Sequence, residues 1–377
     1  MKRRLEDRLK GLHVLPATFT VPEAESAPPD GMVGVEANPS AYQQDEAREF
    51  VLRTTHVPFG ANFGGHTLIE PSGEDSRIAG ILGKCPDYAR VHPGERVYLD
   101  TETTSLAGGA GVWVFMIGLG SFDERGFLIR QYLMEHPGGE PSMLFAVRDH
   151  LLEKKAVVSF CGKSFDAPRT RDRFLYQRDV ELASHLASLV HLDLYHAGKR
   201  LLGHRMPNHR LQSFERQFLN HERVDDLPGA ECAEAYFSYQ RGEGAAMERV
   251  FEHNRLDVLA LPMLEQVLRR HAEHPTDGRE ALAMGLLDKE YGSGVASDRL
   301  LSGLLQWPIS MAAAPPASLR RALRYLCLEG ELEAAQKLIS LALRVHPERA
   351  VEFARAMNVR RSRRESEGLS RAMGEDR

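Results

Sequence analysis

The spacing of hydrophobic and polar positions changes along this 377-residue chain, and each change marks a new element. Short apolar runs bounded by turn residues predict five strands, at 96–101, 113–122, 126–133, 156–160 and 190–194. Apolar residues at helical spacing predict helices at 140–152, 167–177, 209–219, 229–241 and 246–271. The first three strands follow one another directly, and the last two alternate with helices. This order predicts an α/β domain over 96–271, with a mixed five-stranded sheet flanked by helices.

The segments that flank this domain have other patterns. Residues 1–48 predict an N-terminal tail or linker, because 15–47 are rich in Pro, Ala, Glu and Gly and lack periodicity. Residues 49–95 combine a strand-like run with glycine turns and predict a small N-terminal β-rich extension. Residues 272–377 predict an α-helical C-terminal region, in which 329–335 and the apolar helix after it resemble a tetratricopeptide (TPR) helix pair. Stable arrays of such pairs need about three repeats, so this region is interpreted as a degenerate or capping array.

Composition narrows the class of protein. With 42% hydrophobic and 27% charged residues the chain is typical of a globular protein, and its net charge of −5 does not indicate a nucleic-acid binder, although a local basic groove stays open. Its four cysteines have no zinc-like spacing, which favours free thiols in a reducing cytoplasm. The charged start lacks the apolar core of a signal peptide, and the longest apolar run, 112–119, is too short to cross a bilayer. We therefore expect a cytoplasmic protein without a membrane partner.

Candidate chemistry begins where predicted strands end. Asp100 and Glu102 end the first strand, and side chains two residues apart lie on one face of a strand. Asp166 follows the glycine turn after the strand at 156–160, where it could equally cap a helix. Asp257 lies in a long amphipathic helix, one turn after His253 and on the same face. Each feature alone is more typical of a solvated turn, a cap or a surface hydrogen bond.

Taken together, the carboxylates predict a metal centre. Four carboxylates without a compensating Lys or Arg would destabilise the fold, because like charges repel. Two divalent cations would remove this repulsion and could activate a water for attack on a phosphodiester. Oxygen donors favour Mg²⁺ or Mn²⁺. His253 beside them could orient or deprotonate that water.

The ordered set of motifs resembles the DEDD (DnaQ-like) 3′–5′ exonuclease superfamily on the ribonuclease-H-like fold, and more closely the bacterial YprB-like ribonuclease-H-like family. The resemblance covers roughly residues 50–271 and rests on five segments, which are 100–109 (DTETTSLAGG), 162–166 (GKSFD), 191–194 (HLDL), 211–215 (LQSFE) and 252–258 (EHNRLDV). It implies metal-dependent hydrolysis of nucleic acid from a 3′ end, with release of nucleoside monophosphates.

The resemblance also implies a role for each matching residue. Asp100 would bridge both metal ions, Glu102 and Asp257 would ligate the one that holds the nucleophilic water, and Asp166 would support the other through its waters. His253 would position or deprotonate the nucleophile.

The chain departs from the family pattern at two positions. Cys161 stands where the superfamily usually has Asn, five residues before the Asp of the second motif. His253 occupies the position, four residues before the final Asp, where one branch of the superfamily has Tyr.

Several weaker contacts and alternatives remain. Candidate nucleic-acid contacts, each alone more typical of a surface or core group, are Thr101, Lys163, Phe165, Asn254 and Arg255. Asp193 is either a second carboxylate behind the metal ligands or a helix cap. The basic tail at 360–364 is a solvated end or a nucleic-acid contact, and the C-terminal helices could bind a protein partner. The expected main partner is nucleic acid, as a single strand or a 3′ end. The alternatives to an exonuclease are an inactive nucleic-acid-binding or scaffold protein and a structure-specific endonuclease.

Overall fold

The computed structural model describes residues 43–44, 49–105, 111–291 and 294–357. Most of the predicted N-terminal tail, the end of the first motif at 106–109 and the basic tail at 360–364 lie outside these residues. The described residues divide into two compact units, one that ends at His274 and one that starts at Pro275. No helix among the described residues is both long enough and apolar enough to span a bilayer.

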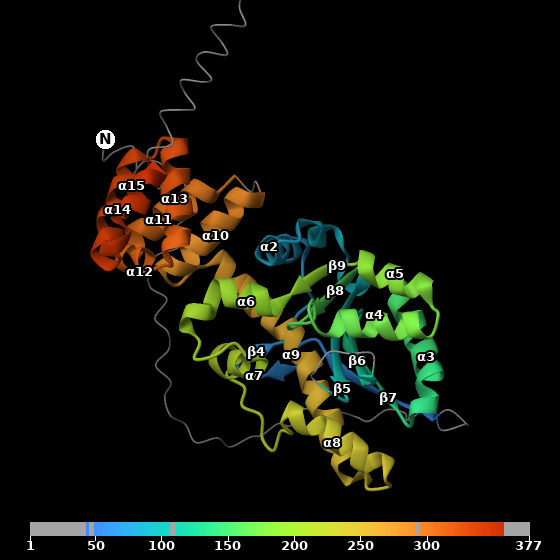
Figure 1. The fold of residues 1–377 in the computed structure, drawn as a ribbon. Helices are drawn as coiled ribbons and strands as arrows, with labels where there is room; N and C mark the ends of the chain where they lie inside the picture. The colour runs from blue at the N-terminus through green and yellow to red at the C-terminus, as the bar shows by residue number, and fades with distance from the viewer. Residues whose placement is uncertain (1–42, 45–48, 106–110, 292–293, 358–377) are drawn as a thin grey trace, which may run out of the picture. The chain divides into compact units, whose positions relative to one another are not determined.

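The first unit is built on a mixed seven-stranded sheet with the order β1-β2-β7-β6-β5-β8-β9 (Figure 1). Its strands are β1 (Gln43–Gln44), β2 (Phe50–Pro58), β5 (Arg96–Thr103), β6 (Val114–Asp123), β7 (Gly126–Met134), β8 (Ala156–Ser159) and β9 (Val190–Asp193). Neighbouring strands from β1 to β5 are antiparallel, and β5, β8 and β9 are parallel. The five predicted strands are therefore confirmed as β5 to β9, in a ribonuclease-H-like arrangement.

Residues 49–95, expected as a small β extension, are continuous with this sheet. Strand β2 pairs with β7 along its whole length, from Phe50 opposite Met134 to Pro58 opposite Gly126. It thereby covers backbone groups of β7 that would otherwise form an open edge. The rest of the segment forms a two-stranded hairpin, β3 (Asn62–Phe63) with β4 (His66–Thr67), and helix α2 (Gly73–Gly83).

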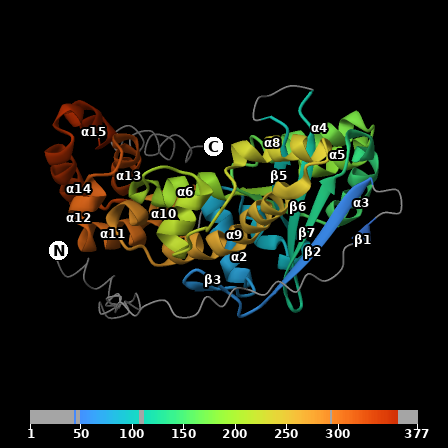
Figure 2. The same ribbon diagram turned by 90° about the horizontal axis from the view of Figure 1, so that it is seen from below.

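Helices cover both faces of the sheet. They are α3 (Glu140–Leu152), α4 (Asp166–Tyr176), α5 (Val180–Ser188), α6 (Leu194–Leu202), α7 (Leu211–Phe214), α8 (Gly229–Gln240) and α9 (Met247–Glu273). The long helix α9 lies across β5, β6 and β7 (Figure 2). In β7, Gln131 contacts α9, whereas its neighbour Tyr132 points to the opposite face, toward His150 of α3. A strand alternates its side chains between faces, so α9 and α3 pack on opposite sides of the sheet.

The second unit is entirely helical among its described residues. Its helices are α10 (Gly278–Tyr291), α11 (Ala296–Gln306), α12 (Pro308–Ala312), α13 (Pro316–Glu329), α14 (Leu332–Val345) and α15 (Ala350–Met357). They share a leucine-rich core that includes Leu300, Leu323 and Leu338. The predicted helix pair is α13 and α14, and Gly330 ends α13 in the left-handed conformation (φ +86°) that a residue without a side chain adopts most easily.

Candidate active site

Two small residues in β6 allow α9 to approach the sheet closely. A Cβ atom at Gly118 would lie 2.3 Å from the side-chain oxygen of Asn254, and one at Gly120 would lie 2.8 Å from Val258. Both distances are far below a normal contact, so only glycine allows this packing. The approach places the motif at 252–258 directly over β5, where Asp100 and Glu102 lie.

Asn254 connects α9 to the first carboxylate. Its Nδ2 donates a 2.8 Å hydrogen bond to Oδ2 of Asp100, and its Oδ1 accepts one of 3.0 Å from Nε2 of Gln131. Gln131 also donates to the carbonyl of Phe251, at 2.7 Å. This buried relay from β7 fixes the amide of Asn254 and, through it, the orientation of Asp100.

Asp166 reaches the cluster from the other face of the sheet. It is the first residue of α4, and Oγ1 of Thr101 donates a 2.5 Å hydrogen bond to its Oδ1. Thr101 and Asp100 are adjacent in β5 and therefore point to opposite faces. Asp166 and Asp100 nevertheless interact electrostatically, so the site lies at the end of β5, where groups from both faces meet.

Asp193 holds the loop that precedes Asp166. Its Oδ1 accepts hydrogen bonds of 3.0 Å from the backbone N–H groups of Cys161 and Tyr195, and its Oδ2 accepts one of 3.1 Å from the backbone N–H of Lys163. Asp193 therefore caps α6 and also shapes the turn between β8 and α4. Cys161 lies in this turn with φ +67°, a left-handed conformation in which Asn is favoured over most other residues. Cys161, which stands where the superfamily usually has Asn, therefore affects the backbone conformation of this turn and also lacks the side-chain amide of Asn.

His253 points into the cluster. Its Nδ1 lies 2.8 Å from Oδ1 of Asp226, and a carboxylate there accepts the Nδ1 proton. Its Nε2 lies 3.5 Å from Oδ2 of Asp257 and 4.0 Å from Oε1 of Glu102. Asp226 therefore fixes the ring so that Nε2 faces the carboxylates of the first and last motifs.

The prediction that no Lys or Arg compensates the carboxylates is wrong. The buried guanidinium of Arg223 forms ion pairs with Glu215, Asp226 and Asp257. It bonds to Oδ1 of Asp257 and leaves Oδ2 facing His253. Since Asp226 in turn holds His253, this one cation connects the last carboxylate to the histidine.

Burial and mutual repulsion perturb the other carboxylates. Burial raises the pKa of Asp100 well above its ordinary value, and the charges of Asp257, Glu102 and Asp166 raise it further. Burial also raises the pKa of Glu102 to about 8, against the attraction of His253, and the pKa of Asp166 to about 6. Without a cation, these groups therefore retain protons at a pH where an exposed carboxyl would be charged.

The pKa of His253 is shifted in the same direction. Burial alone would lower it, but the hydrogen bond to Asp226 and the charges of Asp257 and Glu102 outweigh burial and raise it to about 9. The cationic form of the ring is therefore favoured while the neighbouring carboxylates carry their charges.

The weaker candidates divide into buried and exposed groups. Asn254 and Thr101 are buried and bonded to Asp100 and Asp166, so they orient carboxylates and offer no surface to a phosphate. Lys163 is exposed, Phe165 lies 3.5 Å beneath the guanidinium of Arg169, and Arg255 pairs with Glu252. These three remain predictions as substrate contacts.

Sequence reasoning missed four residues of this site. Arg223 and Asp226 lie between α7 and α8 in a stretch without periodicity, and nothing in it marks them. Glu215 belongs to a segment of the family resemblance, but no role was evident until the structure placed it against Arg223 in a π-helical turn, Glu215–Leu219, that continues α7. Cys232 was interpreted as a free thiol, and it lies beside Glu102 and His253.

Two comparisons with known proteins agree with this architecture. Residues 97–269 match the model of the RNase_H superfamily. A Bacillus subtilis (strain 168) protein, described as "Uncharacterized protein YprB", is 31% identical over 192 residues, which are 50% of this chain and 46% of the relative. The chain thus matches somewhat less than half of this curated relative's length. The region that matches the superfamily model includes the carboxylates of β5, α4 and α9.

Proposed function

We propose that the chain is a cytoplasmic metal-dependent nuclease of the YprB-like branch of the ribonuclease H superfamily, and specifically a 3′–5′ exonuclease. The match of residues 97–269 to the superfamily model and the similarity to the Bacillus subtilis protein support this proposal. The observation that carries the proposal is the convergence of the buried Glu102 and Asp166 with the half-buried Asp100 and Asp257 in one cluster.

The donor set fits divalent cations. Asp100, Glu102 and Asp166 have raised pKa values because burial and repulsion disfavour their charged forms, and a bound cation would favour those forms. These three residues and Asp257 would hold two Mg²⁺ or Mn²⁺ ions, which oxygen ligands favour. When bound, such ions activate a water and stabilise the charge that develops on the phosphodiester.

His253 would manage the proton of the attacking water. Its Nδ1 is held by Asp226, which leaves Nε2 as the nitrogen that can accept a proton. Its raised pKa comes first from the hydrogen bond to Asp226 and then from the charges of Asp257 and Glu102. When those charges are neutralised, the pKa falls toward working pH, and Nε2 can act as a base.

Substrate would reach the cluster past Lys163 and the Phe165–Arg169 pair. Lys163 is exposed on the loop before Asp166, and the guanidinium of Arg169 lies over the Phe165 ring at the start of α4. A lysine can contact phosphate, and an aromatic ring or a guanidinium plane can stack on a base. We propose a single-stranded or frayed 3′ end as the substrate, and a protein partner as the ligand of the C-terminal helices.

The test is cleavage of 5′-labelled single-stranded DNA and RNA oligonucleotides by the full chain, with Mg²⁺ or Mn²⁺ and with EDTA. Asp100→Asn and Glu102→Gln remove charge from the cluster, and Asp87→Asn, whose side chain is exposed and pairs with Arg90, is the matched control. We expect a ladder shortening from the 3′ end that EDTA and both cluster variants abolish and the control retains. Internal cuts would show an endonuclease instead, and binding of both polymers without cleavage would contradict enzymatic activity.

A further inference from the structure

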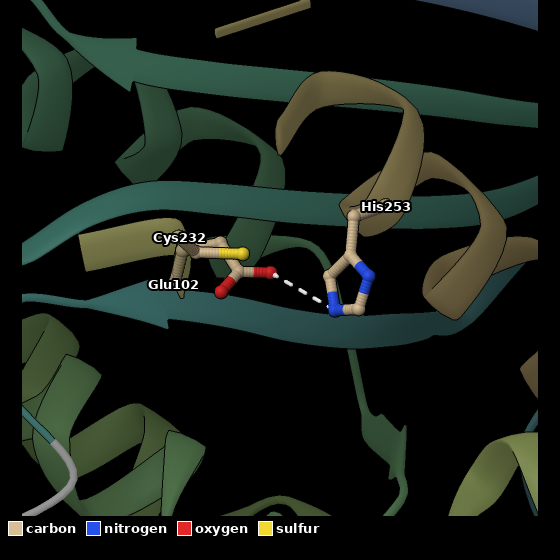
Figure 3. Close-up of side chains that lie close together, drawn as sticks. All are labelled: Glu102, Cys232 and His253. Carbon is tan, nitrogen blue, oxygen red and sulfur yellow. Dashed lines mark ion pairs between the residues drawn. The ribbon is translucent and has the colours of Figure 1, made fainter. Parts of the chain in front are cut away.

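Three side chains of different chemistry meet within the candidate active site. Glu102 comes from β5, His253 from α9 and Cys232 from the first turn of α8. A carboxylate oxygen, a ring nitrogen and the sulfur all lie within 4.8 Å of one another, and all three residues are buried. Figure 3 shows the sulfur beside the Glu102 carboxylate, with both directed toward the His253 ring.

This donor set differs from that of a magnesium site. Mg²⁺ and Ca²⁺ bind oxygen ligands, whereas a thiolate together with an imidazole is typical of Zn²⁺. The proposed function uses Glu102 and Asp257 as oxygen donors and assigns no role to Cys232.

The surroundings of His253 match those of a zinc-bound histidine. A histidine that ligates zinc through one nitrogen typically donates the other N–H to a carboxylate. Here Nδ1 is paired with Asp226, and Nε2 faces Glu102. A fourth donor lies close, because Oδ2 of Asp257 is 3.5 Å from Nε2 while Arg223 holds Oδ1 of the same carboxylate.

We propose that Glu102, Cys232, His253 and Asp257 form a site for Zn²⁺ that overlaps the site of the catalytic ions. Because Zn²⁺ would occupy Glu102 and Asp257, it would exclude Mg²⁺ or Mn²⁺ from those ligands and inhibit the enzyme. Binding of Zn²⁺ stands on the geometry alone, whereas inhibition rests on the proposed function.

The charges of the site are compatible with this ion. On binding, the S–H bond of Cys232 and the Nε2–H bond of His253 break, and their protons and any proton on Glu102 go to the solvent. Bonds from the sulfur, Nε2 and the carboxylate oxygens to zinc form, with no change of oxidation state. Burial and the neighbouring Glu102 raise the pKa of this thiol, so it keeps its proton until a metal ion arrives, and a coordinating thiol then loses it. Three anionic ligands exceed the charge of Zn²⁺ by one, and the cation of Arg223 lies against Asp257 to offset it.

The binding test uses Co²⁺ as a spectroscopic stand-in for Zn²⁺, titrated into the full chain without nucleic acid. We expect a thiolate-to-cobalt absorption band that Zn²⁺ abolishes by competition. Cys232→Ser should lose the band, and Cys161→Ser, a change of the half-buried cysteine in the loop before Asp166, should keep it. Asp226→Asn should keep the band but weaken Zn²⁺ binding by about 10–100-fold, as expected for a carboxylate behind a histidine ligand.

A reciprocal variant keeps the test decisive if Cys232→Ser does not fold. It retains Cys232 and changes Cys85, Cys161 and Cys327 to Ser, and the band must persist in it. Absence of the band from the wild-type chain, or its persistence in a folded Cys232→Ser chain, would overturn the proposed site.

Inhibition is measured separately, as the loss of Mg²⁺-dependent cleavage when Zn²⁺ is added. The cleavage rate of each variant is compared with the rate of the same variant without Zn²⁺. We expect Cys232→Ser to require at least about tenfold more Zn²⁺ than wild type, since one ligand is lost. Equal sensitivity of the two chains would refute competition at this site. A cobalt band that depends on Cys232 in a chain without cleavage activity would support the zinc site and contradict the proposed function.

Discussion

Replacing Arg223 with methionine should reveal how strongly the carboxylates depend on this one cation. The side chain is 4% exposed and pairs with Glu215, Asp226 and Asp257. Removing one partner of a buried ion pair leaves uncompensated charge and costs about 3–5 kcal/mol. In a unit of this size each kcal/mol lowers the melting temperature by about 2–4 °C, so the expected fall is roughly 6–20 °C.

The assay is thermal unfolding of the full chain in EDTA, followed by circular dichroism. Arg255→Met is the matched control, because Arg255 lies on α9 and pairs with Glu252, whose side chain is 53% exposed. A pair of that kind contributes at most about 1 kcal/mol. The double variant Arg223→Met/Glu215→Gln should lose less stability than the two single variants lose together, since glutamine removes a carboxylate that has lost its partner.

Two results would refute this reasoning. If Arg223→Met is no less stable than the control, the three carboxylates do not need the guanidinium. If the effects of Arg223→Met and Glu215→Gln simply add, the two side chains are not energetically coupled.

Three further predictions follow from the geometry. In EDTA, the stability of the fold should fall as pH rises from about 5 to 9. The pKa values of Glu102 (about 8) and His253 (about 9) are raised, so folding favours the protonated forms of both groups. A Tm that rises over this pH range would contradict these shifts. Cys161→Asn should raise stability by about 1 kcal/mol in denaturant unfolding, because Asn tolerates φ +67° better; a loss of stability would show that the thiol itself is needed. Gly118→Ala should cost about 1–3 kcal/mol in the same assay and abolish cleavage, because the methyl group displaces Asn254; an active, stable variant would show that α9 can move without harm.

The fold was largely predictable because its strands and helices carry strong local patterns. The strand predicted at 156–160 is Ala156–Ser159, and the helix predicted at 246–271 is Met247–Glu273. The place of β2 in the sheet was not predictable, since its paired residues in β7 lie 68 to 84 positions further along the chain and no local signal specifies that pairing. The bend at Cys161 was likewise hidden, because its conformation depends on Asp193, which holds the loop from another strand.

The carboxylates of the candidate site could be found because each follows a recognisable element. Asp100 and Glu102 are in the strand β5, and Asp166 begins a helix after a glycine turn. The groups that orient them come from positions with no such signal. Arg223 and Asp226 lie in an irregular segment, and only the folded chain shows that they face Asp257 and His253.

These orienting groups change the physical picture of the cluster. The sequence suggested that the four carboxylates repel one another and that only divalent cations could relieve this repulsion. The folded chain, however, supplies neutralising charges of its own. Arg223 pairs with Asp257, and His253, whose pKa is raised, faces Glu102. The carboxyl groups of Asp100 and Glu102 also favour their protonated forms, because their pKa values are raised. A divalent ion entering this site would therefore displace protons and compete with internal cations. Metal binding and proton release are then linked, and the positions of Arg223 and His253 determine which carboxylate oxygens remain open to an ion.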